Sequence, residues 1–511
     1  MAVRKHLTAI FRWLPRVRRE SSRSHGSPRE NANSDASPRT PQDAGVSRTR
    51  LAVVGMTWTT IGMGFYSILQ VPVLAVLARL IPPAEFGVAN TVLIVFGFGA
   101  NIFQGGVMLN IAQRKIISGR DAAFAFQVSL SLAGLLFLIT VISAGLIESL
   151  FRAPGLHEAI IVISFAFLIR GCTAVSEALL FHEQRYKAAA SVNFFPFALG
   201  YAPVAIGLAY MGFSFWAIVI GNISLQLVKL VQLVALAPHP IFVRPKISEL
   251  HDHATQTLTF SVGRLATYFV DQGPSMVVGR VLGMEALGLY GRICQIMMIP
   301  DKVFTKVVTS VTTPLYASVQ DDQARVARAL RNSIRMVSII MAPSTVFLVV
   351  FRSEIVFLLL GEAWIEAADV LAILGVASFF MVIYKVPLSV LHAQGLGKST
   401  AISQTIYAAG TMAGTIMVAD QGLEAVATAI AALGAANYFF VSYQAIWRVG
   451  MAPFVYVKAH SSGLAIGAGF LLVAVMLRHA LAGQVHDVVA AGVAGVCLIL
   501  AIMYPVYRFA K

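Results

Sequence analysis

The chain has 511 residues, of which 57% are hydrophobic and only 12% are charged. Soluble globular proteins carry about 25% charged residues, so this composition excludes an ordinary soluble protein and indicates an all-α integral membrane protein. The apolar residues form blocks of about 20, the length of a helix that crosses the hydrocarbon core. The net charge of +15 does not indicate nucleic-acid binding, because no basic soluble module follows the N-terminal tail.

Residues 1–50 precede the first apolar block and are rich in arginine. We expect a basic, largely disordered cytoplasmic tail, because the run from Ser21 to Arg50 consists mostly of Ser, Pro, Asn and Arg. The composition also resembles an organelle transit peptide, and composition alone leaves that alternative open. A cleaved signal peptide is disfavoured, since no continuous apolar stretch follows the first basic residues.

The apolar blocks predict about fourteen membrane-spanning helices. A first set of six lies within residues 51–237, a cytoplasmic linker at 238–255 follows, a second set of six lies within 256–447, and a final pair lies within 448–511. In chain order the expected segments are 53–78, 88–110, 123–147, 157–180, 191–210, 213–236, 256–281, 287–315, 334–351, 367–392, 400–418, 423–446, 460–478 and 487–507.

The loop charges predict the orientation, because Lys and Arg are retained on the cytoplasmic side of a membrane. With the N-terminus inside, most basic loop residues fall inside, as in the loop with Arg114 and Lys115. Fewer basic residues fall outside, and these are Arg79, Arg152, Arg280, Arg352 and Arg478. Both termini are therefore expected in the cytoplasm.

Two stretches of the chain are alike when the sequence is shifted by 201 positions. Residues 74–90 then align without a gap with residues 275–291, so that Arg79 meets Arg280 and Gly87 meets Gly288. A repeat of six helices preserves the membrane orientation of each half. We therefore expect two lobes related by an axis along the membrane normal, with a pathway between them, which is a transporter's architecture.

Ionisable residues inside spanning helices are costly and are candidates for function. Helical spacing places Arg264 and Asp271 on one face of the seventh helix, and Arg292, Lys302 and Lys306 on one face of the eighth. Three further intramembrane candidates are Arg170, Glu177 and Lys385. The cations could bind an anionic group, and Asp271 and Glu177 could couple an ion. Alternatively, Arg264 with Asp271 and Arg170 with Glu177 form internal pairs, and Lys302 and Lys306 extend toward a membrane interface.

Enzymatic and ATP-driven functions are disfavoured. Residues 392–400 (HAQGLGKST) approach a phosphate-binding loop, but His392 replaces its first glycine and no soluble domain surrounds it. The longest loops are too short for a glycosyltransferase or polymerase site. The cysteines are isolated from one another, so we expect no metal and no cofactor.

Several motifs carry a resemblance to a known family. Residues 77–89 (LARLIPPAEFGVA), 112–115 (AQRK), 270–300 and 314–322 (PLYASVQDD) are similar to patterns of the Wzx-type polysaccharide flippases. These belong to the superfamily that also contains the MATE exporters and the peptidoglycan-precursor flippases. The resemblance covers about residues 51–450.

The resemblance implies a flippase for oligosaccharide linked to undecaprenyl diphosphate, with a cationic cavity between two six-helix lobes. Its expected partners are this anionic glycolipid, membrane lipids, and polysaccharide polymerase and export machinery. The nearest alternative is an ion-coupled multidrug exporter of the same superfamily, which favours acidic rather than basic residues in the cavity.

Overall fold

The structure is a computed structural model, and it describes residues 48–103, 111, 117–242, 265, 268–269, 271–297, 316, 322–481 and 491–498. No strand occurs among these residues, so the described protein is all-helical. The basic tail before residue 48, the linker from residue 243 onward and the residues after 498 lie outside the described ranges.

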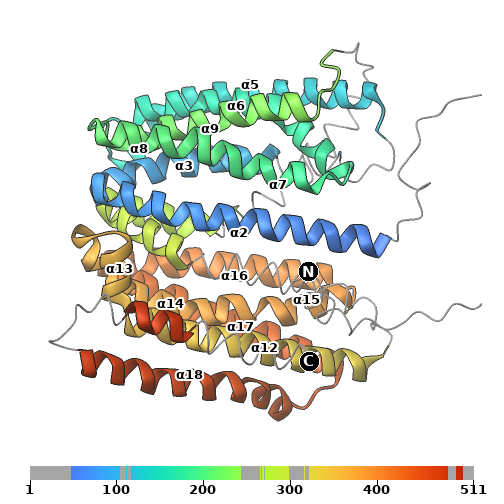
Figure 1. Cartoon of the computed structure of the whole chain (residues 1–511), viewed down its shortest axis with the longest axis vertical. Coiled ribbons are helices and arrows are strands. Elements are labelled where there is room, and N and C mark those ends of the chain that lie inside the picture. Colours follow the sequence, from blue (N-terminus) through green and yellow to red (C-terminus); the bar gives the residue numbers. More distant parts are fainter. Residues whose placement is uncertain are drawn as a thin grey trace, which may run out of the picture.

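The helices run along one common direction in Figure 1. The first group is α2 (Arg48–Leu80), α3 (Pro83–Phe103), α5 (Gly119–Phe151), α6 (Leu156–His182), α7 (Tyr186–Phe195), η3 (Pro196–Tyr201), α8 (Ala202–Tyr210) and α9 (Phe215–Leu236). The second group is α12 (Gln323–Val350), α13 (Arg352–Leu359), η4 (Glu362–Ala367), α14 (Ala368–Ile383), α15 (Lys385–Ala393), α16 (Gly397–Val418), η5 (Ala419–Gln421), α17 (Leu423–Val449) and α18 (Pro453–Leu481). Residues 271–281, 283–297 and 491–498 are also helical.

Within the described residues, 9 helical stretches are long and apolar enough to cross a membrane. Helices satisfy their own backbone hydrogen bonds, which the hydrocarbon core requires of any spanning segment. The stretches coincide with apolar blocks expected from the sequence. The prediction of about fourteen spans includes blocks that the described ranges do not cover.

The helices pack mainly within two groups. In the first, α5 packs on α6, and α6 packs on α9 and α3; in the second, α12 packs on α18 and α14, and α17 packs on α14 and α16. Figure 1 shows the first group above and the second below, with α2 and α16 nearest the boundary between them. Between the two groups, α2 packs on α13.

Some helix ends differ from the sequence expectation. Helix α12 begins at Gln323 rather than near residue 334, because its first three turns are polar and escape a search for apolar blocks. The Asp322 side chain accepts a hydrogen bond from the Arg325 backbone N–H and caps this polar start. Helix α18 likewise begins at Pro453, where proline suits the first turn.

Helix α3 crosses the helix at residues 283–297 with the two backbones in direct contact. A Cβ atom added to Gly87 would overlap the carbonyl group of Met284, and a Cβ atom added to Gly288 would overlap that of Pro83. Because the overlaps are with backbone atoms, side-chain rotation could not relieve them. The crossing therefore requires glycine at both positions.

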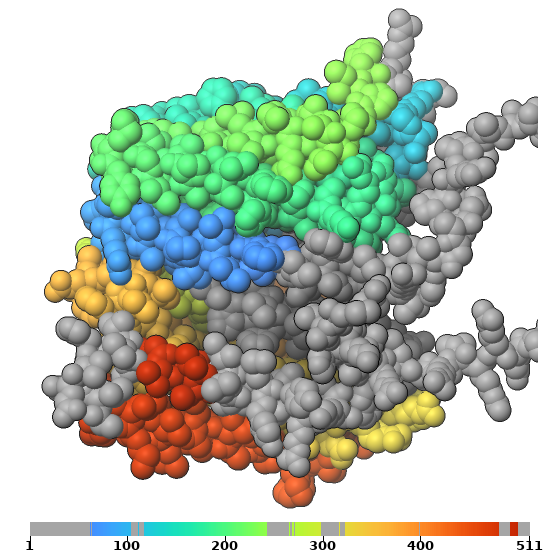
Figure 2. Space-filling model, in the orientation of Figure 1, coloured from blue at the N-terminus to red at the C-terminus, as the bar shows by residue number. Residues whose placement is uncertain are grey.

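Further contacts join the two groups at the same end of the molecule. The indole N–H of the fully buried Trp364 donates to the Ala78 carbonyl at 2.8 Å, and its ring meets Phe86 edge-on with centroids 5.3 Å apart. Arg79 donates from Nη2 to the Leu358 carbonyl at 3.0 Å. Figure 2 shows the blue surface of α2 meeting the orange surface near α13 at the left. The junction is thus tightly packed.

Replacing Trp364 by Phe should lower the thermal unfolding midpoint in detergent by several degrees. The change leaves the Ala78 carbonyl without its indole donor, a loss of about 1–3 kcal/mol for a buried group. Trp447→Phe is the matched control, because Trp447 is 77% exposed. Equal midpoints for the two variants would contradict the importance of the junction hydrogen bond.

Candidate functional site

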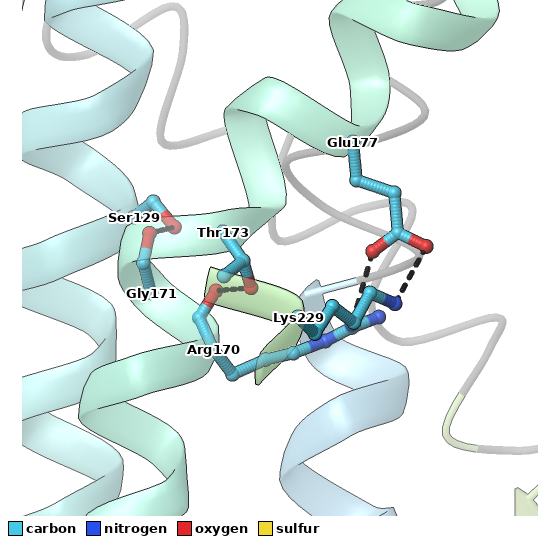
Figure 3. Close-up of polar contacts among 6 residues, drawn as sticks. All are labelled: Ser129, Arg170, Gly171, Thr173, Glu177 and Lys229. Atoms are coloured by element: carbon cyan, nitrogen blue, oxygen red, sulfur yellow. Dashed lines mark hydrogen bonds and ion pairs between the residues drawn. The ribbon is translucent and has the colours of Figure 1, made fainter. Parts of the chain in front are cut away.

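A buried ion cluster joins α6 and α9 (Figure 3). Arg170 and Glu177 lie two turns apart on α6, and Arg170 Nη1 donates to Glu177 Oε2 at 3.0 Å. Lys229 on α9 donates from Nζ to the other carboxylate oxygen at 2.9 Å. The side chains of Arg170, Glu177 and Lys229 are only 7%, 13% and 8% exposed. The internal pairing of Arg170 with Glu177 is therefore present.

The cluster carries one positive charge more than negative charge, because two cations share a single carboxylate. Two buried polar atoms near it also lack partners within the part of the chain that the structure describes: Arg170 Nε, and Oε1 of Gln226, one turn before Lys229. Buried charges are tolerated only when paired. This arrangement leaves a donor and an acceptor available inside the first helix group.

Arg292 occupies the junction between the two helix groups. Its guanidinium lies over the ring of Phe86, 4.2 Å from the centroid, which is a cation–π contact. Its Nη1 donates to the side-chain oxygen of Gln295, one turn further along the same helix. This hydrogen bond places Arg292 and Gln295 on one face of their helix, and the guanidinium contributes to the contact of that helix with α3.

The remaining candidates are placed as follows. Asp271 is exposed, and its carboxylate lies within electrostatic range of the hydroxyl groups of Tyr268 and Tyr407. Lys385 is half-buried at the first position of α15. Arg264, Lys302 and Lys306 lie outside the described residues, so their roles remain predictions.

Sequence reasoning did not single out Lys229, although a signal was present. Lys229 is the one charged residue in the 22-residue helix α9, and such a residue is a functional candidate by its cost alone. Trp364 was missed too, since its partner Ala78 is 286 positions away. No spacing pattern in the sequence reports a contact of that kind.

The segment that approaches a phosphate-binding loop in sequence lies at the connection between α15 and α16. Gly395 has a φ of +75° and forms a turn between α15 and α16, so residues 392–400 connect two helices rather than a strand and a helix. Among the described residues, no group of three His, Cys, Asp or Glu side chains is placed to hold a metal ion.

A family model described as "Polysaccharide biosynthesis protein" matches residues 76–369, which is more than half of the chain. The chain belongs to this family. The resemblance to Wzx-type flippases read from the motifs is thereby confirmed at family level, and the apolar helices identify this member of the polysaccharide biosynthesis family as a multi-pass membrane protein.

A curated relative and two solved structures are similar to this family member. The succinoglycan biosynthesis transport protein ExoT of Rhizobium meliloti (strain 1021) is 24% identical over 305 residues, covering 59% of this chain and 61% of ExoT. The chain thus spans only 61% of the length of ExoT, and it spans 63% of a second relative, a Klebsiella pneumoniae protein described as "Uncharacterized membrane protein in cps region".

The solved structures share the fold. The lipid II flippase MurJ, in an inward closed conformation, superimposes with a TM-score of 0.70 at 14% identity, covering 88% of this chain and 98% of MurJ. An inward-facing multidrug resistance MATE transporter of the MOP superfamily gives a TM-score of 0.59 at 16% identity, covering 80% and 96%. The described helices therefore adopt a MurJ-like and MATE-like fold.

The ion cluster yields a stability prediction. Glu177→Gln should destabilise the protein by about 3–5 kcal/mol, because it leaves Arg170 and Lys229 buried without a counter-charge. The readout is the amount of denaturant needed to unfold the purified protein in detergent. Glu183→Gln is the control, because the Glu183–Arg185 pair is solvent-exposed and should matter by less than about 1 kcal/mol.

A double variant separates charge balance from side-chain packing. Glu177→Gln combined with Lys229→Gln keeps the net charge of the cluster at its original value, so it should recover part of the lost stability. A double variant no more stable than Glu177→Gln alone would show that charge pairing does not hold α6 and α9 together.

Proposed function

We propose that this family member is a flippase that moves undecaprenyl-diphosphate-linked oligosaccharide from the cytoplasmic to the periplasmic leaflet of the bacterial inner membrane, for exopolysaccharide or lipopolysaccharide synthesis. The family match over residues 76–369 is the observation that carries the proposal. ExoT is named as a transport protein of succinoglycan biosynthesis and MurJ as a lipid II flippase. A cargo that is both glycan and lipid agrees with both names.

The proposed architecture is about fourteen helices in two six-helix lobes related by an internal parallel repeat, followed by two C-terminal helices. Support comes from the crossing of α3 with residues 283–297. Gly87 and Gly288 differ by the 201-position shift of the sequence repeat, and so do their contact partners Pro83 and Met284. Exchanged contacts of this kind are what a two-fold relation between equivalent helices produces.

Transport proceeds by alternating access between the lobes, with both chain termini in the cytoplasm. The junction contacts of Gly87, Gly288 and Trp364 lie at the helix ends near Arg79, Arg280 and Arg352. The loop charges assign these ends to the periplasmic side. The junction therefore closes the pathway toward the periplasm, and cargo enters from the cytoplasmic side.

Cations bind the diphosphate of the cargo. The proposed substrate-binding residues are Arg170, Arg264, Asp271, Arg292, Lys302, Lys306 and Lys385, with Asp271 and Glu177 as ion-coupling residues. The surplus positive charge of the cluster formed by Arg170, Glu177 and Lys229 supports an anionic cargo. Charge-assisted hydrogen bonds to phosphate oxygens are strong in a poorly hydrated site.

A multidrug exporter is the second candidate, because the fold is also similar to a MATE transporter. Export of cationic drugs favours a surplus of carboxylates, whereas the described ion cluster has a surplus of cations. The charge balance therefore favours the flippase. The protein acts without enzymatic chemistry, in the company of membrane lipids and of polysaccharide polymerase and export machinery.

The function is tested in a strain that lacks the gene. Deletion should cause lipid-linked oligosaccharide to accumulate, measured by mass spectrometry of extracted lipids, and the intact protein should reverse this. Altered drug sensitivity without such accumulation would instead favour the exporter.

Lys302→Gln combined with Lys306→Gln should abolish export without lowering the amount of protein in the membrane, because the diphosphate loses two cations.

The matched control for that variant is Lys458→Gln, which removes an exposed positive charge from α18. This control should export glycan normally. Unimpaired export by the Lys302 and Lys306 double variant would remove these lysines from the binding site while leaving the flippase proposal to the deletion experiment.

The glycine crossing offers a test of alternating access. Gly288→Val should prevent closure of the junction, because its side chain would occupy the place of the Pro83 carbonyl. A cysteine at the buried Ala89, in a background without the native cysteines, should then react faster with a membrane-impermeant thiol reagent added from outside. Gly134→Val is the control, since a Cβ atom added there would meet no side chain and no other helix within 4 Å. Unchanged reactivity in Gly288→Val would contradict the proposal that the junction closes the pathway toward the periplasm.

A further inference from the structure

The consecutive helices α17 and α18 diverge from a tight turn. Helix α17 ends at Val449 and α18 begins at Pro453, and Gly450 between them has a φ of +63° that reverses the chain. The two helices then pack on different neighbours: α17 packs on α14 and α16, whereas α18 packs along α12. A wedge opens between them from the turn inward.

The wedge contains a cavity of about 590 Å³, within the range of small-molecule sites in proteins. Aromatic rings from α14 and α17 form much of its wall; these are Phe379, Phe380, Tyr438, Phe439, Tyr443 and Trp447. Among the described residues that line it, none is Asp, Glu, Lys or Arg. The chemistry of this cavity therefore suits an uncharged, apolar occupant.

Polar side chains tie the two helices together across the wedge. The hydroxyl of Tyr438 and Nε2 of His460 are 2.7 Å apart, and the hydroxyls of Ser442 and Tyr456 are 2.8 Å apart. His460 Nδ1 lies 3.1 Å from the Tyr456 carbonyl oxygen. If Nδ1 donates to that carbonyl, Nε2 accepts from Tyr438. The polar groups thus satisfy one another, and the occupant need not supply hydrogen bonds.

The cavity is open to the bilayer and has the depth of one leaflet. Tyr443 and Trp447 are exposed on α17, and α18 forms the lower edge of the molecule in Figure 1. Along α17 the lining runs from Tyr438 to Gly450, which is about 18 Å of helix. Half of a hydrocarbon core is about 15 Å, so the cavity reaches from one membrane surface to about the bilayer centre.

We propose that this wedge is a binding site for one hydrocarbon chain of a bilayer phospholipid, taken from the leaflet at which α17 and α18 are joined. A phospholipid chain matches the depth of one leaflet, whereas the polyprenyl chain of the proposed cargo is much longer than the cavity. Helix α18, which forms one wall of the cavity, lies at the lower edge of the molecule, away from α2 (Figure 1). The occupant is therefore a resident lipid rather than cargo.

The test uses the full-length protein in vesicles of phosphatidylethanolamine and phosphatidylglycerol that contain a trace of phosphatidylethanolamine with a diazirine on one acyl chain. After irradiation, peptide mass spectrometry should find labelling on buried lining residues such as Tyr438 and Tyr456, which are 4% and 3% exposed. Val457→Trp fills the wedge from the α18 side and should reduce labelling of Tyr438 about tenfold, the factor expected from excluding two methylene groups.

Val455→Trp is the matched control. Val455 is two positions from Val457 on the same helix and does not line the cavity, so labelling of Tyr438 should persist. Two results would overturn the proposal. Labelling spread evenly to outward residues such as Leu472 would indicate ordinary contact with surrounding lipid. Loss of labelling on adding excess polyprenyl phosphate would assign the wedge to the cargo chain.

Discussion

The direct contact between the backbones of α3 and residues 283–297 is the constraint on which the junction depends. Inside a bilayer, helices do not gain free energy from excluding water, and small residues that permit close approach supply the packing instead. Gly87 and Gly288 permit that approach in a reciprocal manner. The ring of Phe86, held between Trp364 and Arg292, lies beside the crossing. Because glycine has a hydrogen atom in place of a side chain, these two positions set how closely α3 and residues 283–297 approach each other.

The free-energy cost of burying a charge in an apolar environment explains why the ionisable side chains inside the first helix group lie together. Arg170, Glu177 and Lys229 are buried together, so removing the charge of any one changes the electrostatic interactions of the other two. A structural pair would need one cation for one carboxylate. The second cation leaves the cluster with a net positive charge, which an anionic cargo would neutralise.

The sequence anticipated the features that depend on local pattern. Apolar blocks predicted the spanning helices, and a seven-residue spacing placed Arg170 beside Glu177, because that interval is two helical turns. Helix α12 was predicted too short, since its polar, capped start depends on solvent rather than hydrocarbon. Lys229 joins the cluster, and Trp364 the junction, only through packing between helices distant in sequence. Such contacts have no periodic signal.

The turn at Gly450 shows how packing choices create surfaces that pattern alone does not reveal. Had α18 packed against the helix that precedes it, the aromatic side chains of α17 would be covered by protein. Because α18 instead packs along α12, Tyr443 and Trp447 face the bilayer while the side chains deeper in the wedge remain bonded to one another. An empty apolar space beside lipid forfeits dispersion contacts on one side. A hydrocarbon chain restores those contacts without requiring any polar group to move.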